Sequence, residues 1–225
     1  FSFTADGSSL SPSSVTLGNG SGSNDLLTFA IPSGSKIGSS SAVTVSYTAN
    51  GANSIKDTHS TPVSLIDFTA TAVTNASTVD VTAPTLSSST LDATGKVITL
   101  TFAEALKAQA DSAAIKAGFT VKVDDTTIDA SKITGTQNGD KTQVILTLAD
   151  DVAIGTGQNV TVGYAKSTGN HVDTDNSTDA RVEVADFFAT VASSSTLDVT
   201  APTLSSSALD ATGKVITLTF AEALK

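Results

Sequence analysis

The feature that most constrains this chain is an internal repeat that is almost exact. The 31 residues STVDVTAPTLSSSTLDATGKVITLTFAEALK at positions 77–107 recur at positions 195–225. The two copies begin 118 positions apart and differ only at Val79/Leu197 and Thr90/Ala208. The repeats of solenoid proteins are much shorter, at about 20–50 residues. The period therefore predicts a tandem array of whole domains.

The repeat divides the chain into three expected parts. Residues 77–194 are predicted to form one complete unit. Residues 1–76 are expected to be the C-terminal part of a preceding unit, and residues 195–225 the N-terminal strands of a following one. A unit of this length is close to the usual size of a domain and can bury its own core.

The composition argues against several classes of function. The chain has no Cys, which excludes disulfides, a thiol nucleophile and a cysteine metal site. Its formal net charge is −10, from 22 acidic and 12 basic residues, whereas proteins that bind nucleic acid need clusters of Lys and Arg. No stretch approaches the roughly 18 apolar residues of a membrane-spanning helix. The acidic surplus instead fits a solvated surface, or divalent cations held between carboxylates.

Short alternating segments, separated by Gly, Ser, Thr, Asn and Asp, indicate β-structure throughout. In the segment VITLTF at 97–102, for example, Ile98, Leu100 and Phe102 fall on one face, because strand side chains alternate between two faces. Seven strands, lettered A to G, are predicted in the complete unit, at about 84–90, 96–103, 118–124, 131–136, 142–148, 159–165 and 181–191. This spacing predicts an all-β fold, with each unit an immunoglobulin-like β-sandwich.

One short helix is expected in the connection between strands B and C. Asp111 is a suitable N-cap and Gly118 a suitable stop for a helix at 111–117. The dipeptide Asn138-Gly139 predicts a tight hairpin between strands D and E.

Four motifs resemble those of a known family. The segment DVTAPTL at 80–86 resembles its D-x-T-A-P-x-L start, and VITLTFAEAL at 97–106 resembles its second strand, LTLTFSEAL. The segments FTV at 119–121 and VTVGY at 160–164 are similar to its later strands, FTV and VTVSY. Together they identify the chain as similar to the swimming-motility (Swm) repeat, also called the putative flagellar system-associated repeat.

This resemblance also extends to the preceding unit, where NSIKD at 53–57 is similar to the NPIxD loop of the family. The complete unit departs from that pattern at 170–175 (NHVDTD). The resemblance implies an immunoglobulin-like module of very large bacterial cell-surface and adhesin-like proteins. It implies a structural or adhesive role and no catalytic site.

The residues themselves do not indicate an enzyme. The two histidines, His59 and His171, lie in predicted loops at positions that do not match in the repeat. The sequence contains neither a nucleophile elbow nor a Gly-rich phosphate loop. We therefore expect no catalytic activity.

Four acidic residues form a candidate calcium site. In an immunoglobulin-like sandwich, the start of strand A, the B–C connection and the F–G loop share one pole, and Asp80, Glu104, Asp173 and Asp175 fall on these segments. Calcium takes six to eight oxygen ligands, largely carboxylates and carbonyls. A calcium ion bound there would stiffen the junction between units. The alternative is that these side chains are solvated loop acids.

The expected function is structural. The chain is predicted to be a repeat of a secreted bacterial surface fibre, adhesin stalk or surface layer, located outside the cell and giving reach and spacing. Its expected partners are neighbouring repeats, or subunits of the same protein in a filament. Successive units would belong to one long chain, or separate subunits would exchange terminal strands. The alternative function is an adhesive module that binds carbohydrate or another cell.

Overall fold

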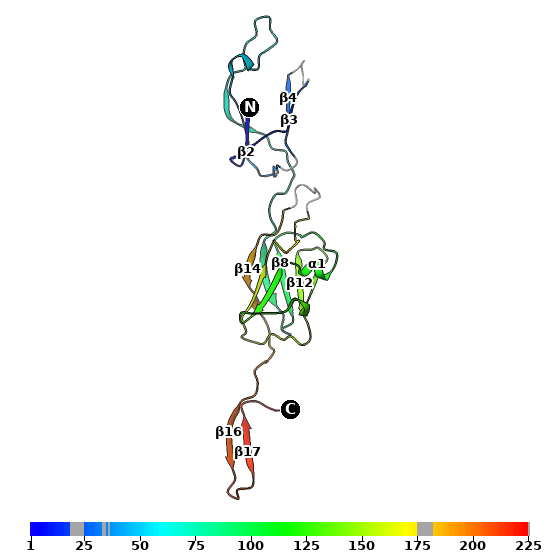
Figure 1. Ribbon diagram of the computed structural model, residues 1–225, viewed down its shortest axis with the longest axis vertical. Coiled ribbons are helices and arrows are strands. Elements are labelled where there is room, and N and C mark those ends of the chain that lie inside the picture. The colour runs from blue at the N-terminus through cyan, green and yellow to red at the C-terminus, as the bar shows by residue number, and fades with distance from the viewer. Residues whose placement is uncertain (19–24, 33–34, 36, 175–181, 225) are drawn as a thin grey trace. The chain divides into compact units, whose positions relative to one another are not determined.

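The computed structural model of the chain describes residues 1–18, 25–32, 35, 37–174 and 182–224 and is almost entirely β (Figure 1). Its contacts define two compact units. One comprises Phe1–Ala83 with Asp173–Val182, and the other Pro84–Val172 with Glu183–Lys225. No helix among the described residues is long and apolar enough to cross a membrane.

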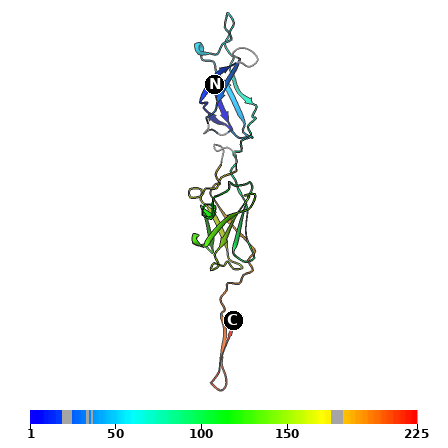
Figure 2. The same ribbon diagram turned by 90° about the vertical axis from the view of Figure 1, so that its right-hand side faces the viewer.

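Two facing sheets form the complete sandwich of the second unit (Figures 1 and 2). One sheet has the order β11-β12-β8-β7-β15 and the other β10-β9-β13-β14. The first sheet consists of β7 (Leu86–Leu91), β8 (Val97–Phe102), β11 (Ile133–Gln137), β12 (Gln143–Leu148) and β15 (Ala192–Ser193). The second consists of β9 (Phe119–Val123), β10 (Thr126–Thr127), β13 (Val160–Tyr164) and β14 (Phe187–Thr190).

The strand order is that of an immunoglobulin-like domain. With the predicted letters, D-E-B-A faces C-F-G, which is the constant-type arrangement. Neighbouring strands pair antiparallel except β15 and β7, which are parallel. The predicted fold class is therefore confirmed.

The core lies between the two sheets and follows the alternation in the sequence. In β8, Ile98, Leu100 and Phe102 are buried, whereas the side chains between them are only half-buried. The same alternation appears in β12. The buried cluster consists of Leu91, Ile98, Leu100, Phe102, Leu106, Ile115, Val121, Ile133, Val144, Leu146, Leu148, Ile154, Val160, Val162, Tyr164, Val184 and Val191.

The turn between β7 and β8 is held by its own residues. The Oδ1 atom of Asp92 accepts hydrogen bonds from the backbone N–H groups of Lys96 (3.0 Å) and Val97 (2.9 Å). Gly95 has φ +69°, a conformation that a residue with a Cβ rarely adopts. The C-terminal hairpin, β16 (Leu204–Leu209) and β17 (Ile216–Phe220), repeats this turn. The conformation of this turn is therefore determined by the residues of the turn itself.

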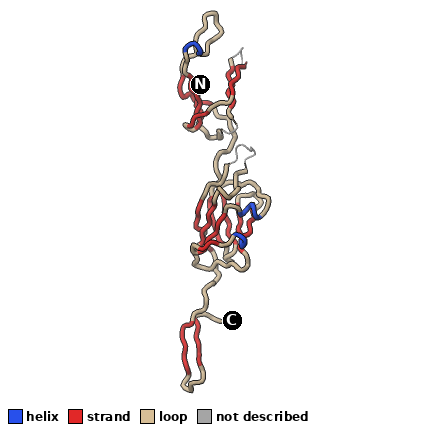
Figure 3. The backbone as a smooth tube through the Cα atoms, in the orientation of Figure 1, coloured by secondary structure: helices blue, strands red, loops and turns tan. Residues whose placement is uncertain are grey.

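The predicted helix is present as α1 (Ser112–Lys116), with a short 3-10 turn η2 (Ala130–Lys132) further along (Figure 3). The carboxylate of Asp111 accepts a hydrogen bond from the N–H of Ala114 at 2.8 Å. It thereby caps the helix as expected.

The predicted strand at 181–191 is wrong in its first half. β14 begins only at Phe187, and position 181 lies outside the described residues. Val182 and Val184, whose alternation suggested a strand, lie in the F–G loop. Val184 is buried in the core and donates its N–H to the carbonyl of His171 at 3.0 Å. The apolar pattern therefore reflects a loop that reaches into the core.

The first unit repeats part of this architecture. Its sheet β2-β1-β5-β6 consists of β1 (Ser2–Ala5), β2 (Ser8–Leu10), β5 (Val43–Tyr47) and β6 (Phe68–Val73), and η1 (Gly51–Asn53) follows β5. A separate ribbon pairs β3 (Ser14–Gly18) with β4 (Leu26–Ala30).

The strand pairings align the two units. Val15 pairs with Phe29 as Ile133 pairs with Leu148, so β3-β4 corresponds to β11-β12. In the same way β2-β1-β5-β6 corresponds to β10-β9-β13-β14. No described strand of the first unit corresponds to β7 or β8. The first unit is therefore an open sandwich.

Candidate functional site

Two of the four acids predicted to bind calcium, Asp80 and Asp173, form hydrogen bonds within their own loops. Asp80 accepts hydrogen bonds from the backbone N–H (2.8 Å) and the hydroxyl of Thr82. Glu104 is half-buried just after β8, and Asp175 lies outside the described residues. Within the described ranges, no group of three or more His, Cys, Asp or Glu side chains is placed to hold a metal ion. Calcium binding stays a prediction.

Asp173 closes the F–G loop. Its N–H donates to the carbonyl of Val182 at 3.0 Å, and its Oδ2 accepts from the N–H of Val182 at 3.1 Å. Asp57 forms the same two hydrogen bonds with Val63 in the first unit. Its N–H donates to the Val63 carbonyl at 3.0 Å, and its Oδ1 accepts from the Val63 N–H at 2.9 Å. The hydrogen bond from the Val63 N–H is the main cause that lowers the pKa of the Asp57 carboxyl. The segment at 170–175 thus differs in sequence from the family loop but keeps its aspartate.

The B–C and F–G connections of the complete sandwich lie together, as the fold predicts. The N–H of Lys107 donates to the carbonyl of Val172 at 2.8 Å. The side-chain amide of Gln109 donates to the carbonyl of Asn170 at 3.3 Å. These bonds fix the pole of the sandwich that carries the loop acids.

His171 lies in the predicted loop but, unexpectedly, is only 1% exposed. Its Nε2 is 2.7 Å from the carbonyl oxygen of Ile115, which can only accept, so Nε2 carries the proton. The other ring nitrogen, Nδ1, is buried with no hydrogen-bond partner among the described residues. The ring packs against Phe119 and Tyr164, with centroids 5.2 and 5.7 Å away.

The first unit has an isoleucine where the complete sandwich has His171. The N–H of His171 donates to the hydroxyl of Tyr164 at 3.0 Å, and the N–H of Ile55 donates to that of Tyr47 at 2.9 Å. Each residue stands two positions before the loop aspartate. That offset is the sequence signal that could have revealed the burial of His171.

We predict that His171→Ile flattens the dependence of stability on pH. Burial lowers the pKa of His171 below its ordinary value near 6.5. The unfolded chain therefore takes up the proton first. The contribution of the neutral ring is complete above pH 6.5 and is lost as pH falls below it. Thermal unfolding between pH 7.5 and pH 5 should show a smaller loss of melting temperature in the variant than in the parent.

The matched control for this prediction is His59→Ile, because His59 is exposed, with its Nδ1 atom 3.1 Å from Oδ2 of Asp57. It should leave the pH profile of the sandwich as in the parent. Equal slopes for the parent and His171→Ile would contradict the assignment of His171 as a buried neutral group.

The segment that leaves the complete sandwich is anchored to it. The hydroxyl of Ser195 donates to the carbonyl of Ile154 at 2.7 Å, and the N–H of Thr156 donates to the carbonyl of Leu197 at 2.8 Å. The N–H groups of Ser194 and Thr196 donate to carbonyls at the end of β7 and in the following turn. The start of the linker is therefore part of the folded domain.

The first unit holds its outgoing segment in the same way. The hydroxyl of Ser77 donates to the carbonyl of Ile37 at 2.8 Å, and the N–H of Ser39 donates to the carbonyl of Val79 at 2.9 Å. We call these contacts the linker anchor. They occur at Ser77–Val81 in the first unit and at Ser195–Val199 in the complete sandwich.

A valine packs on a glycine in each anchor. A Cβ added to Gly38 would lie less than 3.0 Å from the side chain of Val81, and one added to Gly155 less than 3.0 Å from that of Val199. Both glycines are therefore required by close approach of the linker rather than by backbone conformation.

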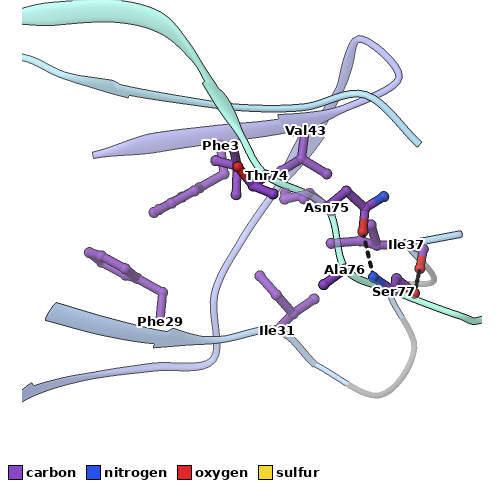
Figure 4. Close-up of a pocket in the computed structure, with 11 residues that line it drawn as sticks. Phe3, Phe29, Ile31, Ile37, Val43, Thr74, Asn75, Ala76 and Ser77 are labelled. Atoms are coloured by element: carbon purple, nitrogen blue, oxygen red, sulfur yellow. Dashed lines mark hydrogen bonds between the residues drawn. The ribbon is translucent and has the colours of Figure 1, made fainter. Parts of the chain in front are cut away.

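The open sandwich of the first unit contains a cleft of about 370 Å³ (Figure 4). Phe3 and Val43 from the sheet line one side, and Phe29 and Ile31 from the β4 side line another. The anchored segment at 74–77 closes one end, where Ser77 bonds to Ile37. The lining is mostly apolar, as in a domain core.

The same positions are covered in the complete sandwich. Val15 is 56% exposed, whereas its counterpart Ile133 is 5% exposed. Val73 is likewise exposed, and its counterpart Val191 is buried. The difference arises because β7 and β8 contribute side chains to the core of the complete sandwich. The cleft is therefore the place of an A–B hairpin.

Comparison with known proteins supports the family suggested by the motifs. Residues 79–169 match the model of the family described as a putative flagellar system-associated repeat. No curated protein and no solved structure matches the chain. The matched segment runs from the linker anchor through β13 and includes all four motifs. Over these residues the complete sandwich is similar to the putative flagellar system-associated repeat.

Proposed function

We propose that the chain is a structural spacer of a bacterial surface fibre, adhesin stalk or surface layer. The observation that best supports this proposal is the linker anchor, which occurs with the same contacts at two junctions 118 residues apart. An anchored linker loses most of its conformational freedom, so the direction in which the chain leaves each domain is defined. Repetition of such a junction would set a regular spacing between units.

Several weak interactions in the linker anchor together restrict the backbone of the linker. Each Ser hydroxyl bond contributes about 0.5–1.5 kcal/mol, and the valine adds less than the about 1.5–3 kcal/mol of full burial, because Val199 is 47% exposed. Together these contributions are comparable with the roughly 1–2 kcal/mol that it costs to fix the backbone of one residue. Fixing the backbone of every linker residue would cost more than these contacts supply, so the anchor holds only the first part of the linker.

This proposal predicts a narrow distribution of distances between the two units. The chain has no cysteine, so the substitutions Ser9→Cys and Thr126→Cys would place one spin label on each unit. Pulsed electron paramagnetic resonance at low protein concentration should give one narrow distance peak. Ser77→Ala with Val81→Ala should broaden that peak, because both contacts of the intervening anchor are removed.

Ser195→Ala with Val199→Ala is the matched control, since it removes the same contacts from the other junction. It should leave the distance between Ser9 and Thr126 unchanged. A broad distribution in the parent chain would overturn the spacer proposal. Calcium is tested in the same measurement, because an ion bound by the predicted ligands Asp80, Glu104, Asp173 and Asp175 should narrow the peak and a chelator should reverse the change.

A further inference from the structure

The outer face of the sheet β10-β9-β13-β14 carries an exposed aromatic side chain. Phe188 on β14 is 83% exposed, whereas its neighbours Phe187 and Ala189 pack against the core. Gly163 pairs with Phe188 across the sheet, and a Cβ added to this glycine would lie less than 3.0 Å from the ring. The ring of Phe188 therefore lies over Gly163, where no side chain separates it from the sheet.

Polar side chains lie beside this ring on the same face. Lys122 pairs with Thr161, and Thr161 pairs with Thr190, in the row of paired residues next to that of Phe188. Strand residues two positions apart point to the same face, so Thr190 and Phe188 share the outer face. Asp125 follows in the turn between β9 and β10. The outer-face hollow that they form, of about 260 Å³, is lined by Lys122, Asp125, Thr161, Phe188, Ala189 and Thr190.

The first unit differs from the complete sandwich at three positions of this face. The pairing of Thr4 with Thr44 and of Tyr47 with Phe68 aligns the two sheets. In the first unit Gly7, Ser46 and Thr69 stand where the complete sandwich has Asp125, Gly163 and Phe188. Asp125 has φ +65°, a conformation that glycine adopts more readily, so its carboxylate is kept at a cost in backbone energy. The ring, the glycine beneath it and the carboxylate thus occur together in one unit and are replaced together in the other.

We infer that the outer-face hollow binds one sugar unit of a neutral glycan. The C–H face of a pyranose ring packs against an aromatic ring, because the face of the aromatic ring is negative and the C–H groups are slightly positive. The sugar hydroxyls both donate and accept hydrogen bonds. Lys122 can donate to them, Asp125 can accept from them, and the threonine hydroxyls can do both. The hollow is smaller than the roughly 300–1,000 Å³ of pockets that enclose a drug-sized ligand, so it suits a single sugar unit.

A neutral ligand rich in hydroxyl groups fits this lining better than other classes of ligand. An apolar protein segment would remove Lys122 and Asp125 from water without supplying hydrogen bonds, which is costly. An anion would be repelled by Asp125 and by the net charge of −10, and a simple cation would be repelled by Lys122. Glycan binding would add a function to the spacer role, and it does not depend on the linker anchor.

The test is a titration of the isotope-labelled full chain with simple sugars, followed by the NMR signals of backbone amides. The probes are the methyl glycosides of glucose, galactose and mannose, and N-acetylglucosamine. At least one probe should shift the amide signals of Lys122, Thr161 and Thr190 in a saturable way. The dissociation constant should be in the millimolar range, because an open site contacts only part of a small ligand. The amides of Thr4 and Thr44 in the first unit are the internal control and should not shift. Absence of a saturable shift with every probe, or equal shifts in both units, would overturn the inference.

Substitutions separate a binding role of this face from a packing role. Phe188→Leu keeps an apolar side chain over Gly163 but removes the aromatic face, so it should weaken binding about threefold to tenfold, whereas Phe188→Tyr should retain binding. Asp125→Gly removes a hydrogen-bond acceptor and relieves the positive φ, so it should weaken binding without lowering the melting temperature. Thr161→Ala should also weaken binding. Its matched control is Thr99→Ala, on the outer face of the other sheet, which should not. Unchanged affinity in both Phe188→Leu and Asp125→Gly, or an equal loss in Thr99→Ala and Thr161→Ala, would refute the assignment of the site.

Discussion

Gly95→Ala is expected to destabilise the complete sandwich by about 2–5 kcal/mol. The left-handed conformation at this position costs a residue with a Cβ about 1–2 kcal/mol. The added methyl group also lies against the carbonyl oxygen of Ile154, and such overpacking costs about 1–3 kcal/mol. The backbone cannot easily yield, because the N–H of Ile154 donates to the carbonyl of Gly95 itself.

Gly213→Ala is the matched control for this change. The two glycines occupy the same turn in the same sequence, and their φ angles are +69° and +66°. Gly213 has open space around it, so its substitution should alter the stability of the sandwich by less than about 0.5 kcal/mol. Hydrogen exchange of amides in β12 and β13 would report the sandwich separately from the first unit. A loss in Gly95→Ala no larger than the about 1–2 kcal/mol of backbone strain would show that the contact with Ile154 contributes nothing.

Leu100→Ala should cost the sandwich a similar amount, about 2–5 kcal/mol, because it removes a fully buried side chain and leaves a cavity. Leu218 is the same residue in the second copy of the sequence, and it is half exposed. Leu218→Ala should therefore leave the protection of β12 and β13 amides unchanged. A Leu218→Ala variant that lowers the protection of the complete sandwich would contradict the division between the sandwich and the hairpin.

Much of the fold could be predicted from the sequence because the signals are local. The alternation in VITLTF places Ile98 and Leu100 in the core, and the turn residues between strands mark their ends. Asp111 was predicted to cap α1, and its carboxylate does so. The repeat itself defined the period, and the seven predicted strands gave the correct class of sandwich.

The remaining features depend on tertiary contacts that no local pattern encodes. Val182 and Val184 alternate like strand residues, but their loop is held by Asp173 and by the carbonyl of His171. His171 has no motif, and its burial follows only from the position that Ile55 occupies in the other unit. The linker anchor joins residues about 40 positions apart, such as Ser195 and Ile154, through hydroxyl and backbone bonds. Polar residues of these kinds are common in loops, so their sequence alone does not reveal which carbonyl they reach.

The parallel pairing of β15 with β7 determines how the domain would respond to a pulling force. The chain enters the sandwich just before β7 and leaves it just after β15, and the two strands run side by side in the same direction. Tension applied through the neighbouring units would therefore slide one strand along the other. Two bonds that join β7 to the residues on either side of β15, from Ser89 to Thr190 and from Ser194 to Leu91, lie across the direction of that sliding. They would share the load and rupture together, whereas the bonds of a hairpin pulled apart from its open end break one after another.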